Sequence, residues 1–144
     1  MNKYQTKNTM SDYHIFKMEK LVRDNIPQIL EEQGAKVFHR IMNENEYYKY
    51  LKLKIMEEAN EVLAAKSRDE VIEELSDLIE VIKNIQSLHK IENDELENAR
   101  IAKKSLKGGF EDRVYIAKIL IPRGHKLAGY YLARSEDYPE EQSS

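Results

Sequence analysis

Residues 43–88 decide the fold, with the sequence NENEYYKYLKLKIMEEANEVLAAKSRDEVIEELSDLIEVIKNIQSL. This stretch contains two capping boxes, Asn43-x-x-Glu46 and Ser67-x-x-Glu70, and each predicts the start of a helix. Apolar residues then recur at helical spacing, which predicts helices from 43 to about 65 and from 67 to about 88. Because the connection is only about two residues long, we expect the helices to lie side by side and antiparallel.

Shorter elements are predicted on both sides of this helix pair. Pro27 and Gly34 fit the first turn and the C-terminal end of a short helix. A third helix is expected from about residue 94 to Lys107, where two glycines end it. Two β-rich runs follow, 114–121 and 127–132, and they predict a small C-terminal β-hairpin.

We therefore expect an all-α helical bundle in three regions. These are a flexible N-terminal arm over 1–16, a helical domain over 17–112, and a C-terminal extension over 113–144 with the hairpin and a frayed tail. Ile79 and Val81 widen the apolar surface of the second long helix beyond one stripe. Modest helices with two-sided apolar faces cover each other poorly, so we expect a homodimer or homotetramer to complete the bundle.

Composition limits the class of protein. The chain has 144 residues, which suits one domain, and its lack of cysteine excludes disulfides, thiolate zinc sites and cysteine nucleophiles. No apolar run approaches the roughly 18 residues of a membrane span, and the first 20 residues lack the apolar core of a secretion signal. We expect a cytoplasmic protein with no membrane partner.

Charge is divided into opposed blocks along the chain. Residues 57–97 carry four Lys or Arg against thirteen Asp or Glu, and residues 98–134 carry nine against two. The total is only −3, without a uniformly basic stripe, so we expect no nucleic-acid partner. An acidic block beside a basic one is consistent with a metal site beside a phosphate site, and equally with solvated helix faces.

Two pairs of carboxylates stand out on the long helices. Glu58 and Glu61 are three residues apart and share a helix face, as do Glu74 and Asp77 on the next helix. At about 100° per residue, Glu58 lies about 20° from Leu51 on the apolar stripe, whereas Glu57 points away from it and is expected to be solvated. Carboxylates at the edge of a core need compensation, and Mg²⁺ or Mn²⁺ would compensate several together. Single acidic pairs in a chain with 26 acidic residues carry little weight alone.

The motif E-E-x-x-E, twelve residues, then E-x-x-D resembles that of the MazG-type all-α nucleoside triphosphate pyrophosphohydrolases, which include phosphoribosyl-ATP pyrophosphohydrolases and dimeric dUTPases. Two flanking segments, KLVRDNIP at 20–27 and KGGF at 107–110, resemble signatures of the phosphoribosyl-ATP pyrophosphohydrolase-like branch. The resemblance covers about residues 19–112 and leaves the last 30 or so residues unmatched.

The resemblance implies a reaction and a set of roles. The reaction is cleavage of a nucleoside triphosphate between the α and β phosphates, which serves to remove non-standard nucleotides. Glu58, Glu61, Glu74 and Asp77 match the positions that hold Mg²⁺, for which Mn²⁺ can substitute. Glu57 matches the first motif glutamate, so Glu57, Glu58 and Glu61 are the catalytic candidates. The candidates for substrate binding are Lys20, Arg23, Asn84, Lys103, Lys104 and Lys107.

The same residues exclude two other classes of protein. A di-iron bundle needs E-x-x-H, and no histidine here has Glu three positions before it. No P-loop motif is present. The alternative that stays open is a non-catalytic helical oligomer, a scaffold or regulator that keeps the family shape.

Overall fold

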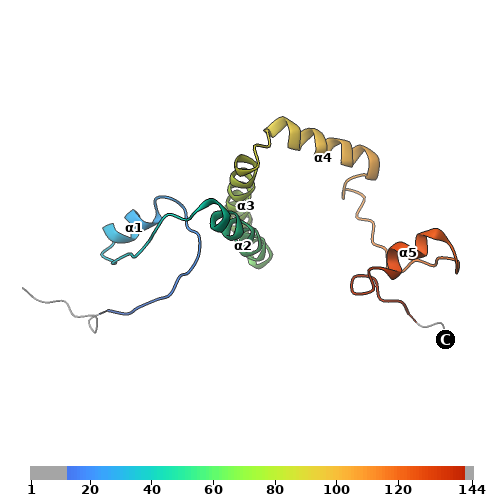
Figure 1. Cartoon of the computed structure of the whole chain (residues 1–144), viewed down its shortest axis with the longest axis horizontal. Coiled ribbons are helices and arrows are strands. Elements are labelled where there is room, and N and C mark those ends of the chain that lie inside the picture. Colours follow the sequence, from blue (N-terminus) through green and yellow to red (C-terminus); the bar gives the residue numbers. More distant parts are fainter. Residues whose placement is uncertain (1–12, 142–144) are drawn as a thin grey trace, which may run out of the picture. The chain divides into compact units, whose positions relative to one another are not determined.

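The structure, a computed structural model, describes residues 13–141, and within this range the chain is all-helical with five helices and no strand. These are α1 (Ile26–Glu32), α2 (Glu44–Ala64), α3 (Arg68–Leu88), α4 (Asn93–Lys107) and α5 (Lys126–Leu132) (Figure 1). The chain divides into two compact units, Met1–Ala99 and Arg100–Ser144, and each is described by itself. The predicted arm over 1–16 lies mostly outside the described residues.

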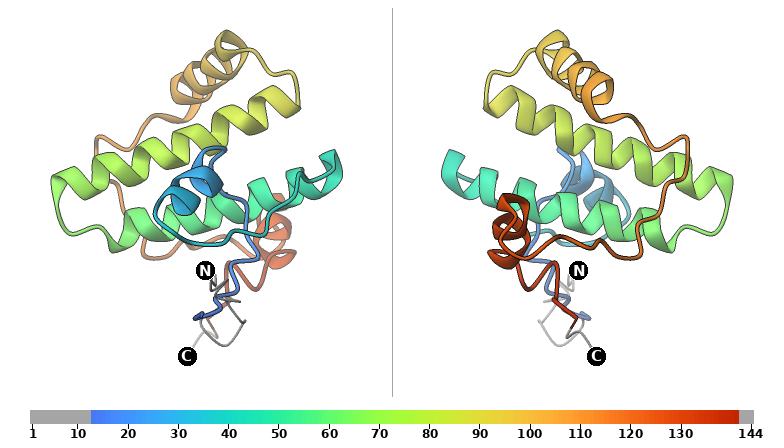
Figure 2. Two further views of the ribbon diagram at one scale, coloured as in Figure 1. Left: turned by 90° about the vertical axis from the view of Figure 1, so that its left-hand side faces the viewer. Right: turned by 90° about the vertical axis from the view of Figure 1, so that its right-hand side faces the viewer.

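The two long helices form an antiparallel hairpin, as predicted (Figures 1 and 2). The side chain of Asn43 accepts a hydrogen bond from the backbone N–H of Glu46 at 2.9 Å, and Ser67 Oγ accepts one from Glu70 at 3.2 Å. These caps satisfy N–H groups that a helix start leaves without partners, which is why both helices begin where the capping boxes stand.

The core of the first unit lies between α2 and α3 and is small. Among the described residues four are buried, the apolar Leu51 and Val81 and the polar Glu58 and Gln86. Much of the apolar surface of α3 stays exposed, so packing of α2 against α3 buries only part of the apolar side chains of the hairpin.

Helix α1 begins at Ile26, near the end of the segment KLVRDNIP. Pro27 lies in its first turn and Gly34 follows its end with φ +96°, a conformation that glycine adopts without strain, so both predictions are confirmed. The predicted third helix is also confirmed as α4, and Gly108 after its end has φ +81°.

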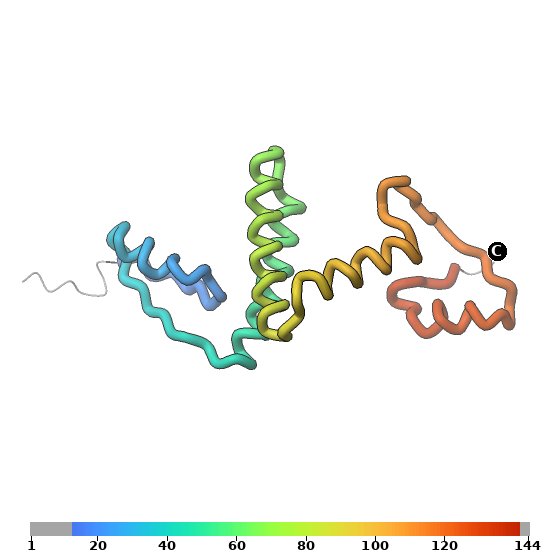
Figure 3. The backbone as a smooth tube through the Cα atoms, turned by 90° about the horizontal axis from the view of Figure 1, so that it is seen from above, coloured from blue at the N-terminus to red at the C-terminus, as the bar shows by residue number. Residues whose placement is uncertain are grey.

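The predicted C-terminal hairpin is wrong. Residues 127–132 lie in α5, which follows a turn at Gly124 (Figure 3). His125 caps this helix, and its Nδ1 accepts a hydrogen bond from Leu127 N–H at 3.2 Å. Tyr131 of this helix packs against Tyr138 with ring centroids 5.0 Å apart. The run 114–121 has no regular secondary structure and pairs with no strand among the described residues, because its expected partner is helical.

None of the helices in the described range combines the length and apolar character needed to cross a lipid bilayer.

Candidate metal centre

Three carboxylates from the helix hairpin come together. Glu58 and Glu61 of α2 and Glu74 of α3 each place a carboxylate oxygen within 4.8 Å of the others. Glu58 and Glu61 share a face of α2 because they are three residues apart, and the antiparallel pairing brings the first half of α3 beside that face. The helices that begin at the two capping boxes thus bring three of the predicted motif glutamates together.

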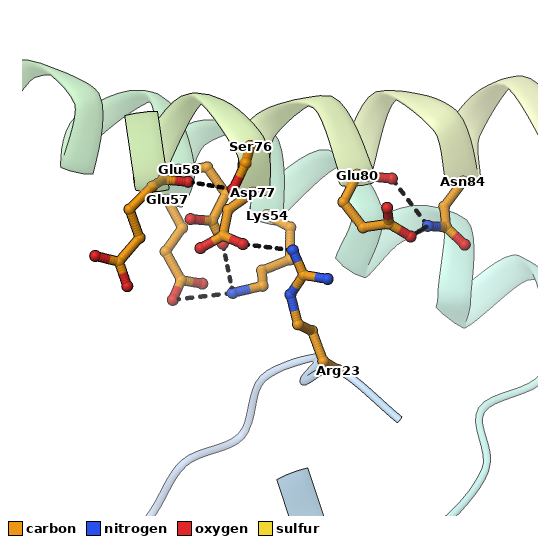
Figure 4. Close-up of polar contacts among 9 residues, drawn as sticks. Arg23, Lys54, Glu57, Glu58, Ser76, Asp77, Glu80 and Asn84 are labelled. Carbon is orange, nitrogen blue, oxygen red and sulfur yellow. Dashed lines mark hydrogen bonds and ion pairs between the residues drawn. The ribbon is translucent and has the colours of Figure 1, made fainter. Parts of the chain in front are cut away.

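Glu58 is the buried member of this carboxylate cluster, with an exposed fraction of 5%, as its place on the apolar stripe predicts. Its charge is compensated by Lys54, one helical turn earlier, whose Nζ lies 2.7 Å from Glu58 Oε1 and 3.3 Å from Glu57 Oε1 (Figure 4). Lys54 is a residue that the sequence analysis missed. Its spacing of four residues from Glu58 is the signal that points to it.

Glu61 and Glu74 face each other across the hairpin. Desolvation raises the pKa of Glu74, and so do a hydrogen bond with Glu61 and the charges of Glu61, Glu73 and Asp77. Two carboxylates in contact repel each other when both are ionised, so one of them holds its proton more tightly. A cation placed between them removes this repulsion.

Glu57 is part of the site rather than freely solvated, which corrects the expectation for this residue. Besides Lys54, it accepts a hydrogen bond from Lys20 Nζ at 2.9 Å. Desolvation raises the pKa of Glu57, but the hydrogen bonds from Lys20 and Lys54 outweigh it, and the net pKa is lowered. Glu57 therefore stays ionised and is a weak proton acceptor.

Asp77 lies outside the three-carboxylate cluster and pairs with Arg23 instead (Figure 4). The hydrogen bond to Asp77 raises the pKa of Arg23, against a smaller opposing effect of desolvation. The side chains of Arg23 and Asp77 are 56% and 32% exposed, and ion pairs as exposed as this usually contribute less than about 1 kcal/mol to stability. The predicted role of Asp77 as a metal ligand stays a prediction.

The donor set of the cluster suits a hard divalent cation. Glu58, Glu61 and Glu74 offer only oxygen ligands, which Mg²⁺ and Mn²⁺ prefer, and no histidine joins the cluster. Desolvation and a hydrogen bond with Glu61 raise the pKa of Glu74, and the nearby charges of Glu61, Glu73 and Asp77 add to this effect. The residues therefore fit the predicted ion.

The other candidates for substrate binding have varied surroundings. Asn84 is engaged inside the hairpin, where Oδ1 accepts a hydrogen bond from Tyr47 at 3.0 Å and Nδ2 donates to the Glu80 carbonyl at 2.9 Å. Lys104 pairs with Glu111, and the hydrogen bond from Lys104 lowers the pKa of that carboxyl. Lys103, Lys104 and Lys107 belong to the second unit, so their role at the carboxylate cluster stays a prediction.

Comparison with known proteins gives one sequence relative and no family. A protein of uncharacterized function from Mycolicibacterium smegmatis is 38% identical over 56 residues, which is 39% of this chain. The matched region spans 57% of the length of that relative. No family model matches the chain, and no solved structure matches it.

Proposed function

We propose that this chain is a Mg²⁺-dependent nucleoside triphosphate pyrophosphohydrolase, which cleaves the α–β phosphate bond to give a nucleoside monophosphate and pyrophosphate. The observation that carries the proposal is the cluster of Glu58, Glu61 and Glu74, whose oxygens lie within 4.8 Å of one another. These are three of the four motif acids that the resemblance to MazG-type enzymes assigns to Mg²⁺.

In this proposal each side chain has its own role. Glu58, Glu61 and Glu74 hold the ion, and Lys54 holds the carboxylate of the buried Glu58 in place through their ion pair. Bound Mg²⁺ supplies charge neutralisation for the phosphates and an acidified water. Lys20 and Arg23 belong to the segment before α1, pair with acids next to the cluster, and are the side chains assigned to bind phosphate oxygens.

We also propose that the chain works as a homo-oligomer. An apolar stripe on α3 is exposed in the single chain and consists of residues at alternating spacings of three and four: Ile72, Leu75, Ile79 and Ile82. This spacing forms a continuous seam along one helix face, which is the arrangement that packs against another helix. A cytoplasmic setting, where thiols are reduced, fits a chain without cysteine.

The test is release of pyrophosphate from a panel of ordinary and modified nucleoside triphosphates, with Mg²⁺ and with EDTA. We expect Mg²⁺-dependent release from at least one of them and none with EDTA. If no nucleotide is cleaved and Mg²⁺ does not raise the melting temperature, the enzyme assignment is wrong and the non-catalytic scaffold takes its place.

A further inference from the structure

Two cations of the segment before α1 reach different helices of the hairpin. Lys20 Nζ lies 2.9 Å from Glu57 Oε1 on α2, and Arg23 pairs with Asp77 on α3. Residues 20–23 have no helical structure, and their two ion pairs connect both long helices to a segment outside them. Figure 4 shows the pair of Arg23 with Asp77. We name residues 20–23 the basic strap.

The two ion pairs of the strap are made with acids next to the carboxylate cluster. Glu57 precedes Glu58 in the chain, and Asp77 follows Glu74 by three residues, so it lies on the same face of α3. Asp77 nevertheless contributes no oxygen to the cluster, and its carboxylate pairs with Arg23 instead. The strap is therefore paired with an acid on the helix face that carries Glu74.

The two kinds of cation near the cluster differ in how firmly they are held. Lys54 is on the same helix as Glu58 and its side chain is only 18% exposed, so it is a fixed part of the site. Arg23 and Lys20 are about half exposed and come from a non-helical segment, so their ion pairs exchange with other cations at little cost.

We propose that the basic strap is a metal-responsive closure, in which Arg23 and Lys20 compete with a divalent cation for Asp77 and Glu57. This inference rests on the proposed metal site. A divalent cation among Glu58, Glu61 and Glu74 repels the guanidinium and ammonium groups beside it and attracts the carboxylate of Asp77. Its binding releases the strap, and the freed Arg23 and Lys20 are then available to a phosphate ligand, which an ion-paired side chain is not.

Binding of Mn²⁺ without nucleotide tests the competition. The probe is Mn²⁺, followed by the electron paramagnetic resonance signal of the free ion. Arg23→Gln removes a competitor, so we expect its affinity for Mn²⁺ to rise about two- to fivefold, the range that loss of an exposed ion pair implies. The matched control is Arg40→Gln, because Arg40 pairs with Glu46 outside the cluster, and its affinity should equal that of the wild type.

A second readout needs no substitution in the strap. Mn²⁺ should accelerate tryptic cleavage of the wild type after Lys20 and Arg23, as followed by mass spectrometry. The Asp77→Asn variant should be cleaved rapidly by trypsin after Arg23 even without Mn²⁺. If the wild type binds Mn²⁺ while Arg23→Gln matches Arg40→Gln and cleavage does not change, the strap proposal fails and the metal site stands. If the wild type binds no Mn²⁺, both proposals fail.

Discussion

Lys54 Nζ lies 2.7 Å from Oε1 of Glu58, the most buried carboxylate among the described residues. Desolvation lowers the pKa of Lys54, but its hydrogen bonds to Glu58 and Glu57 outweigh that effect and the net pKa is raised. The lysine therefore stays charged and supplies the positive charge that the buried carboxylate requires in a single chain.

Replacing Lys54 with methionine should destabilise the first unit. The substitution leaves the buried carboxylate of Glu58 without its partner, which costs about 2–3 kcal/mol of unfolding free energy for a group this well buried. Urea denaturation followed by circular dichroism measures the change. Lys52→Met is the control, because Lys52 packs over the partly buried Tyr48 ring with Nζ 4.4 Å from its centre and supports no buried charge. Equal losses in the two variants would contradict the assigned role of Lys54.

A double variant separates lost charge from lost packing. Lys54→Met combined with Glu58→Leu removes both members of the pair, and such replacements of a buried pair are frequently neutral or stabilising. We expect the double variant to recover most of the stability that Lys54→Met loses. A double variant less stable than Lys54→Met alone would show that the packing of the two side chains, and not their charge, is the larger contribution.

Replacing Glu61 with glutamine should have opposite effects with and without metal. Without metal it removes the charge that repels Glu74, so the melting temperature should stay the same or rise. With Mg²⁺ the wild type should gain stability, about 2.7 kcal/mol at a hundred times the dissociation constant, and Glu61→Gln should lose this gain together with turnover. Differential scanning calorimetry with Mg²⁺ and with EDTA measures both effects.

The control for this experiment is Glu73→Gln. Glu73 precedes Glu74 in the chain but is not among the three clustered carboxylates, so its variant should keep the Mg²⁺-dependent gain.

Like Glu61→Gln, the Asp77→Asn variant should lose turnover while it keeps its fold. Full activity in Glu61→Gln would contradict the metal assignment.

Much of the helix hairpin could be predicted because its determinants are local. Caps, apolar spacing and a short connection involve neighbours in the chain, and Asn43 and Ser67 indeed cap α2 and α3. Burial of Glu58 followed from the same helical spacing. What the sequence could not show is which cation reaches which acid across the fold. Lys20 and Glu57 are 37 residues apart, and Arg23 and Asp77 are 54 apart.

The C-terminal error has a different physical cause. Residues 127–132 contain aromatic residues that favour strands, but a strand also needs a partner, whereas a short helix satisfies its own hydrogen bonds. His125 caps this helix, and Arg134 stacks over Tyr130 with its guanidinium carbon 4.0 Å from the ring centre. These contacts of α5 outweigh the strand preference of single residues.

Ile79→Glu should dissociate the proposed oligomer. Ile79 is 52% exposed in the single chain and lies in the middle of the apolar stripe of α3, so a charge there would be buried at any interface formed by that stripe. Light scattering coupled to size-exclusion chromatography should give an oligomer for the wild type and a monomer for the variant. Ile79→Leu keeps the apolar surface and should stay oligomeric. A monomeric wild type would contradict the proposal.

Replacing Glu46 with glutamine should change how stability depends on pH. Arg40 donates two hydrogen bonds to the Glu46 carboxylate, one of them at 2.8 Å, and these lower the pKa of Glu46 below its ordinary value of 4.5, against a smaller effect of desolvation. Glutamine is accepted at the same position of a capping box as glutamate, so the substitution tests the effect of the Glu46 charge on stability.

The sign follows from proton binding. The folded chain holds the proton on Glu46 less tightly than the unfolded chain does, so protonation favours unfolding. The wild type should therefore be more stable than Glu46→Gln at pH 7, and this advantage should disappear as the pH falls from the ordinary pKa through the lowered one. Urea denaturation at several pH values measures it, with Glu44→Gln in the same helical turn as the control for the helix dipole. An advantage that persisted below the lowered pKa would show that Arg40 does not stabilise α2 through the charge of Glu46.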